Sequence, residues 1–306
     1  MDPNLVGNSA AIFTAFLWAG SSILFTSAGK RIGFLCVNAY RSAIALGMLV
    51  CAHVILLGFI LPIASSQQWF WLGLSGIVGL GIGDFGLFAA YILIGPRRTL
   101  LIMASSPIFA SVGAFLILGE TIQPLAVLGI AITLTGIVVV ILEKEAVKKS
   151  LDEAQKKRKV WGMLAATIAA TGQGVGLVLS KLGMYTGESM AMNPVSAALI
   201  RMIIAAVFVW ICALFLGKLP ELRETAKDKK GLKFVSGGAF VGPFLGMTLS
   251  LFAVSYTQAS IAQTLISLEP LIIIPLVWML FRERTNLRGI FGAALAVVGV
   301  ALLMLS

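Results

Sequence analysis

The sequence contains little charge for its length. Of 306 residues, only 12% are charged, whereas 59% are hydrophobic. A soluble globular protein has about 25% charged and about 45–50% apolar residues. A water-soluble fold of this size could not bury so much apolar surface, but lipid can cover it. The composition therefore excludes an ordinary soluble domain and predicts a membrane protein.

Cysteine and histidine are also scarce. Cys36, Cys51 and Cys212 lie in or beside apolar stretches without metal-ligand spacing, so neither a disulfide framework nor a metal site is indicated. His53 is the one histidine, which leaves no Ser-His-Asp set. The glycine-rich segment 172–176 follows no predicted strand and is not a nucleotide-binding loop. We expect no cofactor, and an integral-membrane enzyme is a remote alternative. No selectivity filter or ring of acids indicates an ion channel.

Ten apolar stretches approach the roughly 20 residues that a transmembrane helix needs. They are predicted at residues 9–28, 37–59, 69–94, 98–117, 123–142, 161–183, 193–216, 234–256, 261–280 and 287–305. Residues 1–4 carry no basic group, so we expect the first stretch to stay as a span rather than be cleaved as a signal peptide. The predicted fold class is an all-α polytopic membrane protein with ten transmembrane helices.

Lysine and arginine are concentrated in alternate gaps between these stretches. The gaps after the first, third, fifth, seventh and ninth spans hold 20 of the 23 basic residues. Lys181 is the one cation assigned to the other side, and Arg41 and Arg201 lie within spans. By the positive-inside rule, the basic loops are cytoplasmic and both termini face outward from the cytoplasmic (inner) membrane. The net charge of +10 then indicates contact with anionic lipid rather than with nucleic acid.

The two halves of the chain repeat each other at a constant offset of 163 residues. Seven residues of the first half (Gly79, Gly83, Ala90, Pro107, Glu120, Gly129, Gly136) correspond to Gly242, Gly246, Ala253, Pro270, Glu283, Gly292 and Gly299. Five spans per half is an odd number, so the second half must enter the membrane from the opposite face. We therefore predict two inverted five-helix repeats, residues 1–143 and 160–306, joined by a basic cytoplasmic linker at 144–159. The linker is interpreted as a short surface helix or a flexible connector. Inverted repeats are typical of secondary transporters with a site near the midplane.

With these features the chain resembles the EamA-like, ten-helix branch of the drug/metabolite transporter superfamily. The resemblance covers both five-span units and includes Trp18-Ala19-Gly20-Ser21 in the first span, Arg41 and Arg201, and the paired Pro107–Glu120 and Pro270–Glu283 spacings. It implies a carrier that exports or imports amino acids, drugs or other small metabolites. It also implies a central cavity lined by spans 1, 3, 4, 6, 8 and 9.

Two carboxylates, Asp84 and Glu269, fall near the middle of predicted spans. Each costs roughly 2.5–3.5 kcal/mol at the centre of a membrane helix, so each needs a compensating use. A carboxyl group in hydrocarbon can be held neutral and can exchange its proton for a cationic ligand. A protonated carboxyl that hydrogen-bonds a neighbouring helix is the structural alternative. The repeat places Met247 and Ser106 opposite them, which favours a substrate-specific role.

Further candidates fall on the spans that the resemblance assigns to the cavity. The predicted substrate-binding residues, besides the two acids, are Trp18, Phe88, Tyr91, Ser105, Gln173, Phe252, Tyr256 and Gln263. Aromatic faces beside buried acids suit a cationic or aromatic ligand. Pro107 and Pro270 each remove a helical hydrogen bond and are predicted to kink their spans, either as gating hinges or as static packing features.

The remaining ionisable groups in the spans are interpreted as structural. Arg41 and Arg201 lie toward the ends of their spans, and we expect them to snorkel or to cap helix ends rather than to contact a ligand. Glu120 is expected to pair locally or to cap a helix, and His53 to be a packing residue rather than a proton relay.

The leading hypothesis is a secondary active transporter that moves small metabolites, amino acids or drugs by alternating access, with proton-coupled export as one form. The alternative is an uptake or exchange carrier for a cationic or nucleoside-like metabolite, in which the acids bind the ligand itself. The expected partners are a small-molecule substrate, the lipid bilayer and protons as coupling ion. A monomer and a homodimer both remain open.

Overall fold

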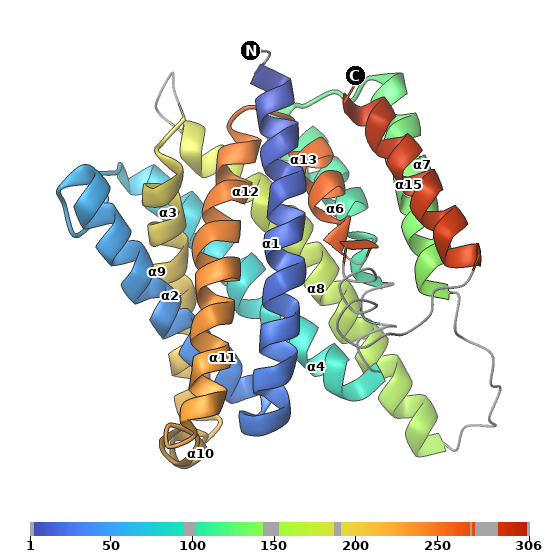
Figure 1. The fold of residues 1–306 in the computed structure, drawn as a ribbon. Coiled ribbons are helices and arrows are strands. Elements are labelled where there is room, and N and C mark those ends of the chain that lie inside the picture. Colours follow the sequence, from blue (N-terminus) through green and yellow to red (C-terminus); the bar gives the residue numbers. More distant parts are fainter. Residues whose placement is uncertain are drawn as a thin grey trace.

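The computed structural model describes residues 3–94, 99, 102–142, 153–186, 191–269, 271–272 and 287–304. This part of the chain is a bundle of helices without strands (Figure 1). In the first half the elements are α1 (Pro3–Ile32), α2 (Phe34–Leu57), α3 (Ser66–Ser75), η1 (Gly76–Gly83), α4 (Asp84–Ile94), α6 (Ser106–Gly113), η2 (Ala114–Leu118) and α7 (Pro124–Leu142). In the second half they are α8 (Glu153–Tyr185), α9 (Pro194–Phe215), α10 (Leu219–Thr225), α11 (Lys229–Ala239), η3 (Phe240–Gly246), α12 (Met247–Val254), α13 (Ala259–Ile266) and α15 (Leu287–Met304). The three η elements are π-helical.

Several helices are long and apolar enough to cross a membrane. Within the described residues there are six such segments: Pro3–Ile32, Phe34–Leu57, Ser66–Ile94, Glu153–Tyr185, Pro194–Phe215 and Lys229–Val254. They coincide with the predicted spans 1, 2, 3, 6, 7 and 8. Shorter apolar helices at Ser106–Leu118 and Pro124–Val139 fall on predicted spans 4 and 5, and α15 falls on span 10. Residues 273–280 of predicted span 9 lie outside the described residues. The prediction of an all-helical chain with several membrane-spanning segments is confirmed.

The bundle is apolar outside, and many of its buried residues are small. Phe13 is 64% exposed, Ile55 80% and Phe215 85%. Ala11 and Ala15, in contrast, are fully buried on the inner face of α1. Lipid is as apolar as these outer side chains, so close backbone packing rather than hydrophobic burial must hold such helices together.

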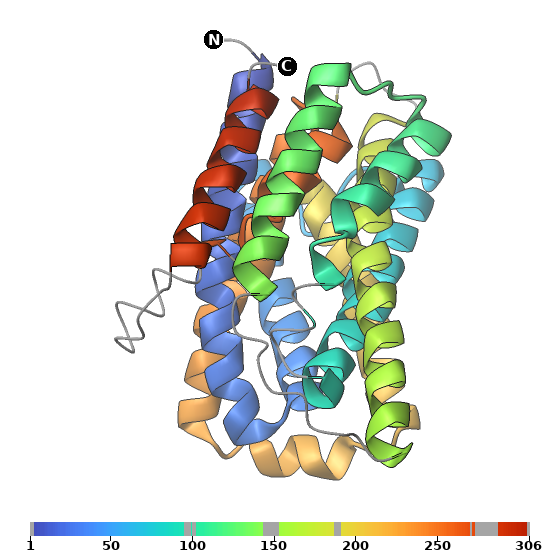
Figure 2. The same ribbon diagram turned by 90° about the vertical axis from the view of Figure 1, so that its right-hand side faces the viewer.

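The helices of the two halves pack in equivalent pairs. α1 packs on α11, η3 and α12, and correspondingly α8 packs on α3, η1 and α4. α2 contacts α9, α6 contacts α13, and α7 lies beside α15 (Figure 2). Helix α1 runs away from the end where both termini lie, whereas α8 runs toward it (Figure 1). The π-helical segments η1 and η3 end at Gly83 and Gly246, which the offset of 163 residues relates. The pairing supports a two-repeat organisation.

Glycine permits the closest of these contacts. A Cβ atom added to Gly172 of α8 would lie 2.6 Å from the carbonyl oxygen of Val78 and 2.9 Å from Cα of Gly83 in η1. At the equivalent crossing, a Cβ on Gly242 of η3 would lie 2.7 Å from Oγ of Ser21 in α1. The glycines of the repeat are therefore contact points between the halves, as small-residue spacing in membrane helices indicates.

The fourth span and the linker can be compared with the predictions. The fourth span is interrupted by a turn at residues 104–105, and Pro107 follows in the first turn of α6. A proline is tolerated there because the first helical amides have no intrahelical acceptor. Pro270 lies outside the described residues. Residues 153–159 of the predicted linker are helical and form the first turns of α8, because this segment is rich in helix formers and carries the Lys156–Glu153 ion pair.

Candidate functional site

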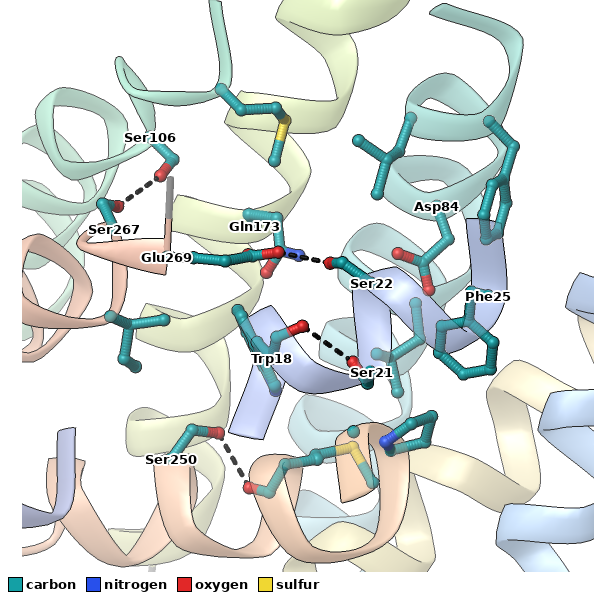
Figure 3. A pocket seen from close by; sticks show the side chains of 18 of the residues that line it. Trp18, Ser21, Ser22, Phe25, Asp84, Ser106, Gln173, Ser250, Ser267 and Glu269 are labelled. Atoms are coloured by element: carbon teal, nitrogen blue, oxygen red, sulfur yellow. Dashed lines mark hydrogen bonds between the residues drawn. The ribbon is translucent and has the colours of Figure 1, made fainter. Parts of the chain in front are cut away.

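A cavity of about 150 Å³ lies in the middle of the bundle. Both halves of the chain line it (Figure 3). Its wall includes residues of α1, α4, α8, η3, α12 and α13, together with Met103, Ala104, Ser106, Ser267 and Glu269. Two basic and two acidic side chains lie in this wall, namely Arg41 and Arg201, and Asp84 and Glu269.

Most of the predicted binding residues meet at this cavity. Its lining contains seven of them, namely Trp18, Asp84, Phe88, Tyr91, Gln173, Gln263 and Glu269. Three predicted residues are outside the lining. Ser105 donates a hydrogen bond back to Ile102 O at 2.6 Å, and its neighbour Ser106 lines the cavity in its place. Phe252 and Tyr256 pack on each other with ring centroids 4.9 Å apart, and Tyr256 is 44% exposed.

Asp84 forms an ion pair with Arg41. The Nη2 group of Arg41 donates to Oδ2 of Asp84, and its Nε donates to Oδ1 of Asn38 at 2.9 Å. The guanidinium lies over the ring of Phe88 at 5.3 Å and that of Phe25 at 5.7 Å from the centroids. These contacts orient the arginine inward from α2. The expectation that Arg41 snorkels toward the membrane surface is therefore wrong, because a buried carboxylate offers a stronger partner than the distant headgroups.

Arg201 also lines the cavity. It is only 5% exposed, and its Nε is a buried atom without a hydrogen-bond partner. The space that a Cβ on Gly79 would occupy is bounded by Nη2 of Arg201 at 3.4 Å, so the side chain runs along the glycine-rich face of η1. The predicted snorkelling is wrong here too. The sequence signal that could have indicated this inward position was the recurrence of an arginine inside both the second and the seventh span.

Glu269 reaches into the cavity from the other side. Its Oε1 accepts a hydrogen bond from Ser22 Oγ, and Gln173 lies beside it (Figure 3). Figure 3 shows Asp84 and Glu269 on opposite sides of Ser22. Among the described residues, no ion pair involves Glu269. The two acids thus differ, since one is paired with a cation and the other with a hydroxyl group.

A second polar cluster joins the interrupted fourth span to α13. Gln263 Nε2 donates to Ser106 Oγ at 3.0 Å, and Ser106 Oγ lies 3.3 Å from Ser267 Oγ. All three side chains line the cavity. They supply amide and hydroxyl groups beside the charged residues.

The bundle is tied together at the end where the termini lie. Lys181 Nζ of α8 lies 2.7 Å from Glu120 Oε1 and donates to Thr257 O at 2.7 Å. The other oxygen, Glu120 Oε2, accepts from Ala259 N at 3.0 Å and so caps the start of α13. Glu120 thus caps a helix as expected, but its partners belong to the other half of the chain rather than to its own neighbourhood.

His53 is held on both ring nitrogens, consistent with the predicted packing role. Nδ1 lies 2.6 Å from Phe59 O, and Nε2 lies 3.0 Å from Ser196 Oγ. Because a carbonyl can only accept, Nδ1 carries the proton and Nε2 accepts from the serine in the neutral ring. His53 does not line the cavity. In the described part of the chain, no three His, Cys, Asp or Glu side chains are grouped to hold a metal ion.

Comparisons with known proteins agree with this architecture. A family model described as the EamA-like transporter family matches residues 5–142 and again residues 160–305. A crystal structure of another protein aligns with a TM-score of 0.72, covering 97% of this chain and 95% of that one at 18% sequence identity. At that identity the likeness extends to the fold alone. No curated protein matches the chain.

Proposed function

Because this chain belongs to the EamA-like transporter family, we propose that it is a secondary active transporter of small metabolites, amino acids or drugs, working by alternating access. The observation that carries this proposal is the cavity with four ionisable groups between the two halves of the bundle. Buried charge at this depth is costly and marks solute pathways in membrane proteins. A site at the interface of two repeats can face either side when one repeat rocks against the other.

The proposed topology has ten spans in two inverted five-helix repeats, residues 1–143 and 160–306, with the linker at 144–159. The opposite directions of α1 and α8 support the inversion (Figure 1). The positive-inside rule puts the basic end, with α10 and the last turn of α1, in the cytoplasm. Both termini are then on the outer side of the cytoplasmic membrane.

In this topology the structure corresponds to an inward-facing state. The cavity wall includes Thr26 in the last turns of α1 and Phe34 at the start of α2, which lie toward the cytoplasmic end. At the outer end, the Glu120–Lys181 ion pair and the cap on α13 join the two halves. Opening to the outside would have to break these contacts.

The cavity volume favours small metabolites over drugs. An apolar cavity of about 150 Å³ accommodates a molecule such as benzene, whereas pockets for drug-sized ligands measure about 300–1,000 Å³. The volume of about 150 Å³ in this structure therefore suits a solute close to benzene in size. The proposed contacts are the predicted residues of its lining, together with Arg41 and Arg201.

Proton coupling is proposed through the two acids, in the direction of export. Glu269 has a hydroxyl partner, whereas Asp84 is occupied by Arg41. A carboxyl group without a cation beside it is the better proton carrier, because its neutral form leaves no unpaired charge behind. Glu269 is therefore the first candidate and Asp84 the second.

The test uses the purified chain in liposomes with an imposed pH gradient. Uptake of a panel of small amino acids, organic acids and amines is measured for the wild type, Glu269→Gln and Asp84→Asn. We expect flux that the pH gradient drives and that Glu269→Gln uncouples from it. Absence of flux for every solute would reject the transporter, and gradient-driven flux that survives in both variants would reject the coupling.

An uptake or exchange carrier is the second candidate, and of its two proposed substrates, cationic or nucleoside-like, the nucleoside-like metabolite has support in the cavity. The amides of Gln173 and Gln263 and the rings of Trp18, Phe88 and Tyr91 favour it, because all five line the cavity. Such groups stack on and hydrogen-bond a heterocyclic base without using charge. Exchange of internal for external nucleoside, unaffected by the pH gradient, would distinguish this candidate from the first.

A further inference from the structure

The two arginines of the cavity occupy equivalent places in the two repeats but have different partners. Arg41 is the eighth residue of α2, and Arg201 is the eighth residue of α9. In the first repeat, Arg41 meets the carboxylate of Asp84 at the start of α4. The residue equivalent to Asp84, 163 positions later, is Met247 at the start of α12. The second repeat therefore has the arginine without its acid.

Among the described residues, the surroundings of Arg201 supply only a shared acid: the charge of Asp84 acts on it, but without an ion pair. Arg201 is 95% buried, its Nε has no hydrogen-bond partner, and no ion pair joins it to a described carboxylate. Asp84 is engaged by Arg41, and the carboxylate of Glu269 accepts from Ser22. A buried guanidinium that lacks an anion is unfavourable unless a ligand completes the pairing.

The groups around it define the rest of the ligand. Asp84 is paired with Arg41, which leaves Arg201 as the one arginine of the cavity without an ion pair among the described residues. Trp18, Phe88 and Leu177 supply apolar wall. A carboxylate, unlike an amine, can pair directly with this guanidinium. The arrangement therefore favours an anionic group on the ligand over the cationic one that the two acids alone predicted.

We propose that the transported solute carries a carboxylate that pairs with Arg201, and that its apolar body lies against the aromatic wall of the cavity. This inference rests on the proposed function and narrows its substrate class. In effect, the solute supplies the anion that the second repeat lacks. A guanidinium pairs with a carboxylate through two parallel hydrogen bonds, which a lysine in its place could not form.

The test compares ligands of one shape and different charge. Thermal unfolding of the purified full-length protein in detergent is measured with benzoate, benzamide and benzylamine, which share a ring of suitable size and are anionic, neutral and cationic. Phenylglycine is added to distinguish an amino acid from a simple acid, since both present the carboxylate. A ligand that binds the native state raises the midpoint of unfolding with concentration. We expect benzoate or phenylglycine to raise it most.

Variants at Arg201 test the assignment. Arg201→Gln should weaken benzoate binding by about tenfold to a hundredfold, the range for a lost hydrogen bond to a charged group, and leave benzamide unaffected. Arg201→Lys should recover part of the loss, because the charge remains without the bidentate geometry. Arg223→Gln is the matched control. It removes an exposed arginine from α10, outside the cavity, and should bind benzoate like the wild type.

Several outcomes would overturn the inference. One is a wild-type protein that benzamide or benzylamine stabilises as much as either carboxylate. Another is an Arg201→Gln variant with wild-type benzoate affinity. If Arg201→Gln does not fold, the inference is still tested by which ligand stabilises the wild type most and by the benzoate affinity of Arg201→Lys. Flux of amines without any preference for carboxylates would refute this inference alone, whereas absence of all flux would refute the proposed function.

Discussion

The ion pair between Arg41 and Asp84 predicts a large loss of stability when one partner is removed. Asp84→Asn keeps the shape of the side chain but leaves the guanidinium without its anion. The two side chains are only 12% and 6% exposed, so water screens the pair little. Breaking a buried pair in this way costs about 3–5 kcal/mol.

The structure places the expected value at the lower end of that range. Arg41 keeps its hydrogen bond to Asn38 and its contacts with the rings of Phe25 and Phe88 after the substitution. Cation–π contacts are worth about 0.5–1 kcal/mol each. The cavity also lets some water reach the charge. We therefore expect Asp84→Asn to lower the free energy of unfolding by about 3 kcal/mol.

The assay is reversible unfolding in mixed micelles titrated with a denaturing detergent. Arg41→Met, Asp84→Asn and the double variant form a double-mutant cycle, in which the coupling energy should reach about 2 kcal/mol. The matched control is Glu153→Gln, which breaks the Lys156–Glu153 pair. Those side chains are 58% and 89% exposed, and exposed pairs contribute about 0–1 kcal/mol.

Two results would refute this reasoning. Asp84→Asn could cost no more than Glu153→Gln, or the losses of the two single variants could add without coupling. In either case the pair would not stabilise the fold, and Asp84 would be available to a ligand or a proton.

Three further predictions concern other parts of the bundle. Glu120→Gln removes the ion pair with Lys181 that joins the two halves at the outer end. The cavity should then open to the outside more often, so a cysteine placed at Leu177 should react several-fold faster with an impermeant maleimide added outside. An unchanged rate would contradict the outer closure. Gly172→Ala would press a methyl group on the backbone of η1 and cost about 1–3 kcal/mol of stability. The control is Gly47→Ala, which has open space around it and should be neutral or stabilising by about 0.5–1 kcal/mol. Equal effects of the two substitutions on stability would contradict the close crossing of α8 and η1. Hydrogen bonds from Arg31, at the end of α1, and from the backbone lower the pKa of Asp228. The stability it adds is present above the ordinary aspartate range and is lost as pH falls through the lowered pKa, so the melting points of the wild type and Asp228→Asn should converge in acid and differ at neutral pH.

The helices could be predicted from the sequence because hydrocarbon imposes a strong local rule. A charged residue in a lipid-facing span is expensive, so long uncharged runs mark the spans one by one. The ungapped repeat from Gly79 to Gly136 predicted equivalent halves, and the paired packing of α1 with η3 and of α8 with η1 agrees with it. The ends of helices and the breaks within them were harder to predict. The fourth span is interrupted just before Pro107, and the sequence did not reveal whether the preceding turn stays helical.

The site could be predicted in part. Asp84 and Glu269 were identifiable because an acid in an apolar span needs a reason to be there. Ser105 was chosen where Ser106 lines the cavity, since adjacent residues of a helix point about 100° apart and only the packing decides which one faces inward. The arginines were misinterpreted because their depth along a span does not reveal whether a partner lies within reach.

The sequence by itself determined that this chain is a helical membrane protein made of two related halves, because hydropathy, charge placement and an internal repeat are written residue by residue. Only the tertiary structure decided which charges meet. Arg41 and Asp84 lie on different helices and pair across the bundle. Arg201, the equivalent of Arg41 in the other repeat, lines the cavity without an ion pair to a described carboxylate. Partnership between side chains on separate helices is set by how those helices cross, and glycine contacts between distant segments of the chain fix that crossing.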